Sequence, residues 1–315
     1  KTFYADGLSI HKLALIVQKH RWSVPYIKGK TMSFVSFEIA GQQTYGLWKD
    51  ESNWIQVPQV FQAEYPDLKS VIAANKLDEC EALIRQSGKA VTASQAHLLP
   101  VIPNPSKIFC IGLNYKTHVA ETKRADSDYP AIFTRFADSL TAHNAPLPRP
   151  KETQRFDFEG ELAVIIGKGG RNITQAQALD HIAGYACFND GTARDWQRHT
   201  HQWIPGKNFP STGPLGPFMA TRKEIPDVNQ LTLESRLNGE VMQHASVADL
   251  IYTLPVIIEY LSGFTNLSPG DVIATGTPGG VGDRREPPVY MKAGDVIEIE
   301  ITGLGTLRNV VSNAA

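Results

Sequence analysis

The chain has 315 residues, with 31 Lys and Arg against 32 Asp and Glu and a formal net charge of −1 at pH 7. This balance provides no basic surface for nucleic acid or an anionic membrane, and 42% hydrophobic with 20% charged residues excludes a disordered chain. The even charge balance makes a small molecule the expected partner. The length exceeds one average domain and predicts a principal domain with a smaller one.

The cysteines and the short apolar runs bear on the compartment. Cys80, Cys110 and Cys187 are widely separated and odd in number, which favours buried free thiols in a reducing compartment. Apolar runs such as Leu13–Val17 are far too short to span a bilayer, and residues 1–31 lack the features of a secretory signal. We therefore expect a cytoplasmic protein that does not contact membranes.

The N-terminal part of the chain predicts a small domain at residues 32–103. Residues 1–31, rich in Lys, His and aromatic side chains, come before a strand-like run, and we interpret them as an extension of uncertain origin. Short runs from Met32 to about Val57 that partly alternate apolar and polar residues predict an antiparallel meander. Apolar residues at helical spacing between Asp67 and Gln86 predict a helix.

Residues 104–315 predict a larger domain in which strands outnumber helices. Its beginning is marked by Pro100, Pro103 and Pro105. We expect strands at 108–111, 156–167, 184–188, 272–275 and 296–301, and helices at 174–182 and 246–262. Regular alternation of strands and helices is missing, which excludes a doubly wound parallel sheet. The sequence therefore predicts a predominantly β fold of the α+β class.

Two glutamates stand two residues apart in the predicted strand 156–167. Side chains repeat every second residue along a strand, so the carboxylates of Glu159 and Glu161 project from one face. Such a pair is more often part of a solvated strand face. Here the strand continues into the apolar run 162–166, where unpaired carboxylates are costly, so the pair requires a cation.

A third carboxylate, Asp190, follows the next apolar strand. It could cap the helical segment that comes after it, or it could join the two glutamates. Three carboxylates at strand ends, with no His or Cys nearby in a ligand spacing, make an all-oxygen site that suits Mg²⁺ or Mn²⁺ rather than zinc.

His118 and Glu121 are three residues apart in a short helical segment and are therefore neighbours on one helix face. The carboxylate can orient the imidazole and raise its basicity, as in a general base with its partner. An exposed pair without function is the common alternative. Tyr115 and the polar stretch Thr122–Tyr129, which indicates a mobile segment, favour function. We interpret the histidines without a comparable partner as surface or structural residues: His143, His181, His199, His201 and His244.

Lys207 and Thr277 lie in loops rich in Gly and Pro. The backbone N–H groups of such loops can hold an anionic oxygen, although the same residues also fit simple turns. Neither loop matches the Gly-rich patterns that bind phosphate. No serine lies in a nucleophile-elbow pattern and no cysteine has a partner His at a telling spacing, so a covalent acyl-enzyme route finds no support.

Taken in order, these motifs resemble the fumarylacetoacetate hydrolase family over roughly residues 108–311. The segment 112–121 resembles the family's lid motif, in which His118 and Glu121 would form the water-activating dyad. The segment 157–162 is similar to the family strand that bears two metal-binding glutamates, here Glu159 and Glu161. Asp190 falls where the third metal carboxylate belongs.

The resemblance also implies substrate contacts. The segment 192–197 and the lysine after it resemble the part of the family that supplies Arg194, Gln197 and Lys207, and the loop of Thr277 resembles its substrate loop. Tyr115 in the lid motif is a further candidate contact. Two departures, Arg135 where Lys is frequent and Pro210 where Asp is frequent, bear on the substrate and leave the metal residues intact.

The resemblance implies a mixed β-roll catalytic domain, a homodimer and Mg²⁺- or Mn²⁺-dependent chemistry on a small 2-oxo acid. The leading hypothesis is hydrolysis of a carbon–carbon bond in a 2,4-dioxo acid of the acylpyruvate or fumarylpyruvate type. In it, His118 deprotonates water, Lys207 stabilises developing negative charge, and Arg194, Gln197 and Thr277 hold the substrate carboxylate.

Two other hypotheses remain open. Decarboxylation of oxaloacetate, or isomerisation or hydration of a dienoate, would use the same metal site. A metal-stabilised binding module that has lost catalysis is the third reading, against which the retained His118 and Glu121 argue.

Overall fold

The computed structural model of the protein describes residues 33–122 and 128–314. The expectations for residues 1–31, and for most of the polar stretch Thr122–Tyr129, lie outside the described residues. The fold consists mostly of strands in mixed sheets with short helices, which confirms the predicted predominantly β, α+β class. None of the helices in the described ranges is long and apolar enough to cross a membrane.

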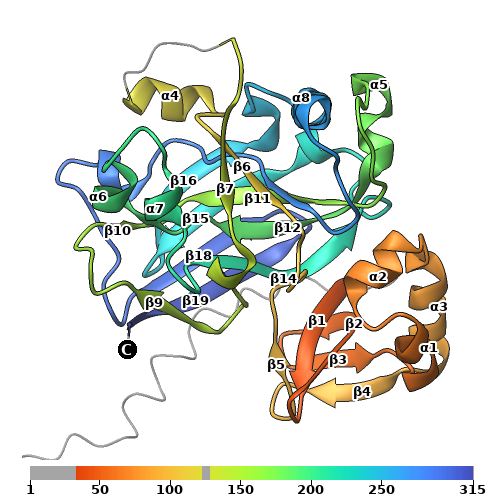
Figure 1. The fold of residues 1–315 in the computed structure, drawn as a ribbon. Coiled ribbons are helices and arrows are strands. Elements are labelled where there is room, and N and C mark those ends of the chain that lie inside the picture. Colours follow the sequence, from red (N-terminus) through yellow and green to blue (C-terminus); the bar gives the residue numbers. More distant parts are fainter. Residues whose placement is uncertain (1–32, 123–127, 315) are drawn as a thin grey trace, which may run out of the picture. The chain divides into compact units, whose positions relative to one another are not determined.

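The larger sheet joins strands from both halves of the described chain (Figure 1). Its hydrogen-bonded order is β4-β3-β2-β1-β14-β12-β11-β17-β6-β7, with β5 paired to β1 and β8 paired to β14. These strands are β1 (Phe34–Ile39), β2 (Gln42–Asp50), β3 (Asn53–Gln56), β4 (Lys89–Thr92), β5 (His97–Leu98), β6 (Ile108–Gly112), β7 (Ala131–Arg135), β8 (Leu140–Thr141), β11 (Gly160–Ile166), β12 (Ile182–Asn189), β14 (Gly213–Thr221) and β17 (Val272–Ala274).

The predicted N-terminal meander is present as β1, β2 and β3, which pair antiparallel. The single predicted helix is in fact α2 (Leu68–Ala73) and α3 (Leu77–Ser87), which follow α1 (Gln59–Glu64). The two helices are separated because Asn75 has a φ of 56°, in the left-handed region that ends a helix. Asp67 begins α2 as its N-cap, since its side chain accepts a hydrogen bond from the backbone of Ser70.

The strand β11 is buried on both faces, which explains its continuously apolar sequence. Leu162, Val164 and Ile166 belong to one core cluster, whereas Ala163 and Ile165 belong to another. Because side chains alternate along a strand, the two clusters lie on opposite sides of the sheet. β11 therefore runs through the centre of the protein and carries Glu161 into it.

A second sheet supplies one side of that core. Its order is β16-β15-β18-β19-β9, and its inward side chains, such as Leu233, Ile297 and Ile299, belong to the same cluster as Leu162. The strands are β9 (Pro146–Arg149), β15 (Thr232–Leu237), β16 (Glu240–Ser246), β18 (Val296–Ile301) and β19 (Gly305–Asn313). A small pair, β10 (Phe156–Asp157) and β13 (Thr192–Ala193), stands beside the site described below.

The remaining α-helices are short. They are α4 (Lys116–Thr122), α5 (Gln175–Ala178), α6 (Arg194–Gln197), α7 (Ile204–Lys207) and α8 (Leu254–Phe264). The prediction of one helix over 246–262 is wrong, because α8 begins at Leu254 after a separate 3₁₀ turn at Val247–Asp249, and Pro255 lies in its first turn. Proline lacks an N–H group and therefore fits the first turn of α8, where that group has no partner in the helix.

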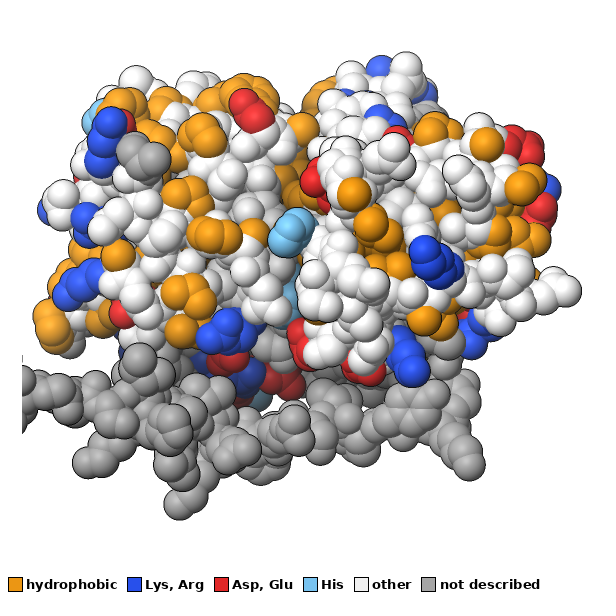
Figure 2. All heavy atoms as spheres, turned by 90° about the horizontal axis from the view of Figure 1, so that it is seen from below, with side chains coloured by type: hydrophobic (Ala, Val, Ile, Leu, Met, Phe, Trp, Pro, Cys, Tyr) orange, Lys and Arg blue, Asp and Glu red, His pale blue; other side chains and the backbone are white. Residues whose placement is uncertain are grey.

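The face of the protein shown in Figure 2 has a mixed surface. Its hydrophobic side chains stand in small groups among polar atoms, and its Lys and Arg side chains are scattered.

Candidate metal centre

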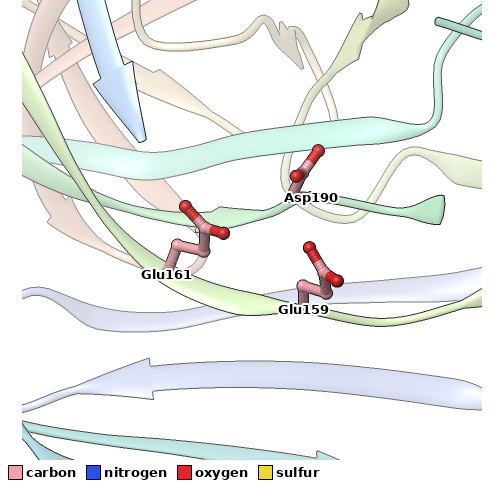
Figure 3. Close-up of side chains that lie close together, drawn as sticks. All are labelled: Glu159, Glu161 and Asp190. Atoms are coloured by element: carbon pink, nitrogen blue, oxygen red, sulfur yellow. The ribbon is translucent and has the colours of Figure 1, made fainter. Parts of the chain in front are cut away.

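Three buried carboxylates meet at the end of two paired strands. Glu159 directly precedes β11, Glu161 lies on it, and Asp190 directly follows β12. Because β11 and β12 pair with Gly160 opposite Asn189, these positions come together. One oxygen of each carboxylate lies within 4.8 Å of the others, and Figure 3 shows the three groups turned toward a common space. The structure thus brings together the three residues that the sequence predicts as metal ligands.

Lys207 lies between two of these carboxylates. Its Nζ donates to Glu159 Oε2 at 2.7 Å and to Asp190 Oδ2 at 2.5 Å. Burial alone would lower the pKa of Lys207, but the carboxylates of Asp190 and Glu159 outweigh burial and raise it. The ammonium therefore stays charged, and one of its three N–H donors remains available for another oxygen.

The guanidinium of Arg194 is bound by two acidic side chains, Asp157 and Glu159. Its Nη2 lies 2.7 Å from Glu159 Oε1 and from Asp157 Oδ2, while its Nη1 donates to Gln197 at 3.2 Å. Burial alone would raise the pKa of Glu159, but Arg194 and Lys207 hold it below its usual range. The sequence reasoning missed Asp157, although it stands two residues before Glu159 in the same period-two spacing.

Arg135, one of the two departures from the family pattern, contacts Asp190 directly. Its Nη1 lies 2.6 Å from Asp190 Oδ1 and its Nη2 donates to Thr212 at 2.7 Å. Both partners and the arginine are buried. The arginine at this position thus contacts one of the three candidate metal ligands directly. Pro210, the other departure, lies in the loop before β14.

Glu161 shows that the site fits a divalent cation. Its Oε2 accepts a hydrogen bond from the backbone of Gly276 at 2.9 Å, and among the described residues no Lys, Arg or His forms an ion pair with it. Burial, together with the nearby Asp190 and Glu159 carboxylates, raises its pKa well above the usual range. A metal ion would relieve this repulsion, and three carboxylates form the oxygen ligand set of Mg²⁺ or Mn²⁺.

The predicted dyad, His118 and Glu121, lies on α4, and His118 lines the same cavity as Glu159 and Glu161. His118 Nδ1 and Glu121 Oε2 are 3.5 Å apart, which is longer than a hydrogen bond. Glu121 Oε1 accepts a hydrogen bond from the backbone of Gly280 at 2.6 Å. The carboxylate therefore faces the imidazole while it is held by the glycine-rich loop 276–282.

The side chain of Thr277 links the loop 276–282 to β11, the strand that carries Glu161. Its hydroxyl donates to the carbonyl of Gly160 at 2.9 Å and accepts from Gln243 Nε2 at 2.7 Å. Gln243 also accepts a hydrogen bond from the backbone of Gly160. Gln243 was not found from the sequence, because no motif surrounds it on β16 and only its burial marks it.

These groups face a cavity of about 470 Å³. The residues predicted from the sequence that line it are His118, Glu159, Glu161, Arg194, Gln197, Lys207 and Thr277. Asp190 and Glu121 do not line the cavity but contact Lys207 and His118, which do. Tyr115 is buried in the core cluster and does not line the cavity, so its substrate contact stays a prediction. His201, interpreted as surface or structural, lines the cavity together with Arg198 and Arg284.

The chain is similar to several known proteins. Residues 107–312 match the family described as fumarylacetoacetate (FAA) hydrolase C-terminal. Oxaloacetate tautomerase fahd2, mitochondrial, from Xenopus laevis is 40% identical over 237 residues, which cover 75% of this chain and 74% of that protein. Oxaloacetate tautomerase YisK from Bacillus subtilis is 42% identical over 222 residues, covering 69% and 74%. A solved fumarylacetoacetate hydrolase from Exiguobacterium antarcticum superposes with a TM-score of 0.79 at 33% identity, covering 90% of this chain and all of that one.

Proposed function

Because the chain belongs to the fumarylacetoacetate hydrolase family, we propose that it is a metal-dependent enzyme that interconverts the keto and enol forms of a 2-oxo acid. The observation that carries this proposal is the buried Glu161, a carboxylate that forms no ion pair with any Lys, Arg or His in the described ranges and faces the same cavity as His118. The tautomerase names of the Xenopus and Bacillus relatives favour this reaction over the hydrolysis expected first from the sequence.

The proposed ligands of a magnesium or manganese ion are Glu159, Glu161 and Asp190. A divalent ion held there supplies positive charge that stabilises the negative charge developing on the substrate. The four buried carboxylates, including Asp157, and the three buried cations Arg135, Arg194 and Lys207 leave a net charge of −1. A divalent ion would change this to +1, which the carboxylate of a bound 2-oxo acid would neutralise.

His118 is the proposed base. Its Nδ1 is turned toward Glu121, so Nε2 is the ring nitrogen left for the substrate. In the keto form, Nε2 removes a proton from carbon 3, and the electron pair moves to the carbonyl oxygen at carbon 2. The third N–H donor of Lys207 stabilises that oxygen as its charge develops. Transfer of the proton now on His118 Nε2 to that oxygen, directly or through water, completes the enol and returns the imidazole to its neutral form.

Hydrolysis of a 2,4-dioxo acid is the second candidate, and the His118 and Glu121 arrangement favours it. The same imidazole would take a proton from water instead of from carbon 3. Incubation of acetylpyruvate in ¹⁸O-labelled water separates the two reactions, because only hydrolysis places the label in the released carboxylate. Decarboxylation of oxaloacetate would release carbon dioxide, which is followed in a separate incubation with oxaloacetate.

The remaining proposals concern organisation. We propose residues 104–315 as the catalytic domain, residues 32–103 as the smaller domain, and a homodimer as the assembly. The sequence expectation of a cytoplasmic location stays a prediction, since the name of the Xenopus relative places that protein in mitochondria.

The decisive experiment follows conversion of enol-oxaloacetate to the keto form by its ultraviolet absorbance. We expect the chelated protein to be inactive and added Mg²⁺ or Mn²⁺ to restore turnover. Glu161→Gln should remain folded and lose metal affinity, whereas Glu240→Gln, a surface control on β16, should behave as the wild type. Full turnover by exhaustively metal-free protein would contradict the proposal.

A further inference from the structure

The outer part of the cavity is basic, in contrast to its acidic floor. Arg198 follows α6 directly, and Arg284 ends the 3₁₀ turn Gly282–Arg284. Both line the cavity that contains Glu159 and Glu161, and both side chains are partly exposed, by 43% and 35% respectively. Neither residue belongs to the motifs that carry the proposed reaction.

These two arginines share one carboxylate. Arg198 Nη2 forms an ion pair with Asp283 Oδ2, and Arg284 Nε lies 3.6 Å from the same oxygen. The hydroxyl of Tyr290 donates to the other oxygen of Asp283 at 2.9 Å. Burial alone would raise the pKa of Asp283, but its hydrogen bond with Arg198 and the nearby Arg194 lower it, so Asp283 stays ionised. Two guanidinium groups against one carboxylate leave one positive charge.

The inner cations make most of their contacts with the buried carboxylates. Arg194 is bound to Asp157 and Glu159, and Lys207 to Glu159 and Asp190. By contrast, the contact with Asp283 is the one side-chain ion pair that the described residues give Arg198 and Arg284. A guanidinium has five N–H donors, so most donors of both arginines remain free to bind an anion in the cavity.

We propose that Arg198 and Arg284 form an anion subsite that binds the second carboxylate of a dicarboxylic 2-oxo acid. This inference rests on the proposed function, in which the 2-oxo acid end lies over the three carboxylates. The substrate then spans the cavity from the metal centre to the arginines. His201, on the same wall, adds a hydrogen-bonding group whose charge is not required.

The test compares two substrates of equal carbon number, oxaloacetate and 2-oxobutanoate, which carries a methyl group in place of the second carboxylate. Proton exchange at carbon 3 is followed by NMR for the full chain loaded with Mg²⁺. The variants are Arg198→Gln, Arg284→Gln and their combination. Arg222→Gln is the matched control, since Arg222 is also an exposed arginine paired with an aspartate, Asp180, but does not line this cavity.

We expect each single variant to raise the KM for oxaloacetate by about tenfold and the double variant by about a hundredfold, the loss that charge-assisted hydrogen bonds imply. The KM for 2-oxobutanoate should change by less than about twofold. Equal loss for both substrates, or no loss for either, would overturn the subsite.

Failure of the proposed function has a different signature. In that case the wild type exchanges neither substrate, and the subsite is then tested by calorimetric binding of oxaloacetate and 2-oxobutanoate. The double variant should bind oxaloacetate about a hundredfold more weakly and 2-oxobutanoate as before. Equal affinity of wild type and double variant for oxaloacetate would overturn the subsite there as well.

Discussion

All three guanidinium nitrogens of Arg135 donate hydrogen bonds at or near Asp190. Besides the contact with Asp190, Nη1 donates to the carbonyl of Gly191 at 3.1 Å, and Nη2 and Nε donate to the hydroxyls of Thr212 and Ser139. The lysine side chain is shorter and ends in a single charged nitrogen, so it cannot make this planar set of contacts. In this chain the arginine therefore determines the orientation of Asp190, one of the three proposed metal ligands.

We predict that Arg135→Lys lowers metal affinity by about ten- to hundredfold, the usual effect of removing a group that orients a ligand. Calorimetric titration with Mn²⁺ measures this directly. The exposed Arg222→Lys serves as the control and should leave affinity unchanged. Unaltered Mn²⁺ affinity in Arg135→Lys would show that Asp190 needs no such support.

His118 gives a second prediction, because it separates catalysis from metal binding. His118→Gln should keep the metal, since the three carboxylates are untouched, while turnover falls by about a hundred- to ten-thousandfold for loss of a general base. Glu121→Gln should reduce turnover less, since an amide keeps a polar oxygen facing the imidazole but cannot stabilise the imidazolium by its charge. The measurements are steady-state kinetics and metal titration of the same samples. Wild-type turnover in His118→Gln would place the base elsewhere.

Single residues differ in how far the sequence reveals them. Glu159 and Glu161 were predictable because strand periodicity alone puts both on one face. Asp157 shares that periodicity and could have been found. Gln243 could not, because its role arises only when β16 brings it to Gly160, 83 residues earlier in the chain.

The loop 276–283 acts as a connector between elements. Its backbone donates to Glu121 on α4 through Gly280, and to Asp157 on β10 through Gly282 and Asp283. The dyad and the acidic strand are therefore held by one segment. Any change in the path of this loop should affect both.

Gly282 allows a test of how tightly this loop is packed. A Cβ atom there would lie 1.8 Å from the carbonyl oxygen of Val289 and 2.6 Å from Asp157 Oδ1, so the backbone must shift. We predict that Gly282→Ala lowers the free energy of unfolding by roughly 1–3 kcal/mol, the cost of overpacking. Urea denaturation measures it. Gly263→Ala in α8, where a Cβ meets nothing within 4 Å, should be neutral or stabilising by up to about 1 kcal/mol. Equal stability of Gly282→Ala and the wild type would mean that the loop backbone can shift to accept the added Cβ atom without a cost in free energy.

Most strands could be predicted from the sequence, but not their partners. The run 108–111 and the run 272–275 were each expected as strands, and they are β6 and β17. Their parallel pairing, Val272 beside Ile108, joins segments about 160 residues apart, and local periodicity carries no information on such pairing. The position of the dyad beside the carboxylates depends on that pairing.

For the whole molecule, the buried cysteines give a simple measure of integrity. Cys80, Cys110 and Cys187 are all free and buried, as the sequence predicted. Burial raises the pKa of the Cys80 and Cys187 thiols to about 12. At pH 8 the reactive thiolate is therefore rarer by about three orders of magnitude than for a free cysteine.

We predict that the native protein reacts with a disulfide reagent such as Ellman's only after unfolding, when all three thiols become available. Raising the pH from 7 to 9 should leave the native protein unreactive, because both values lie far below the raised pKa. Absorbance at the reagent's product band counts the thiols with and without denaturant. Rapid labelling of the folded chain would indicate local opening at one of these sites.

The position of β17 in the sheet also affects how the protein emerges from the ribosome. β17 inserts between β11 and β6, so the strand that bears Glu161 and the strand that leads to His118 cannot join until residue 274 has been synthesised. Until then both apolar strands expose an edge to the surrounding cell, where unpaired strand edges promote aggregation. The candidate metal centre and the dyad are thus brought together only late in translation.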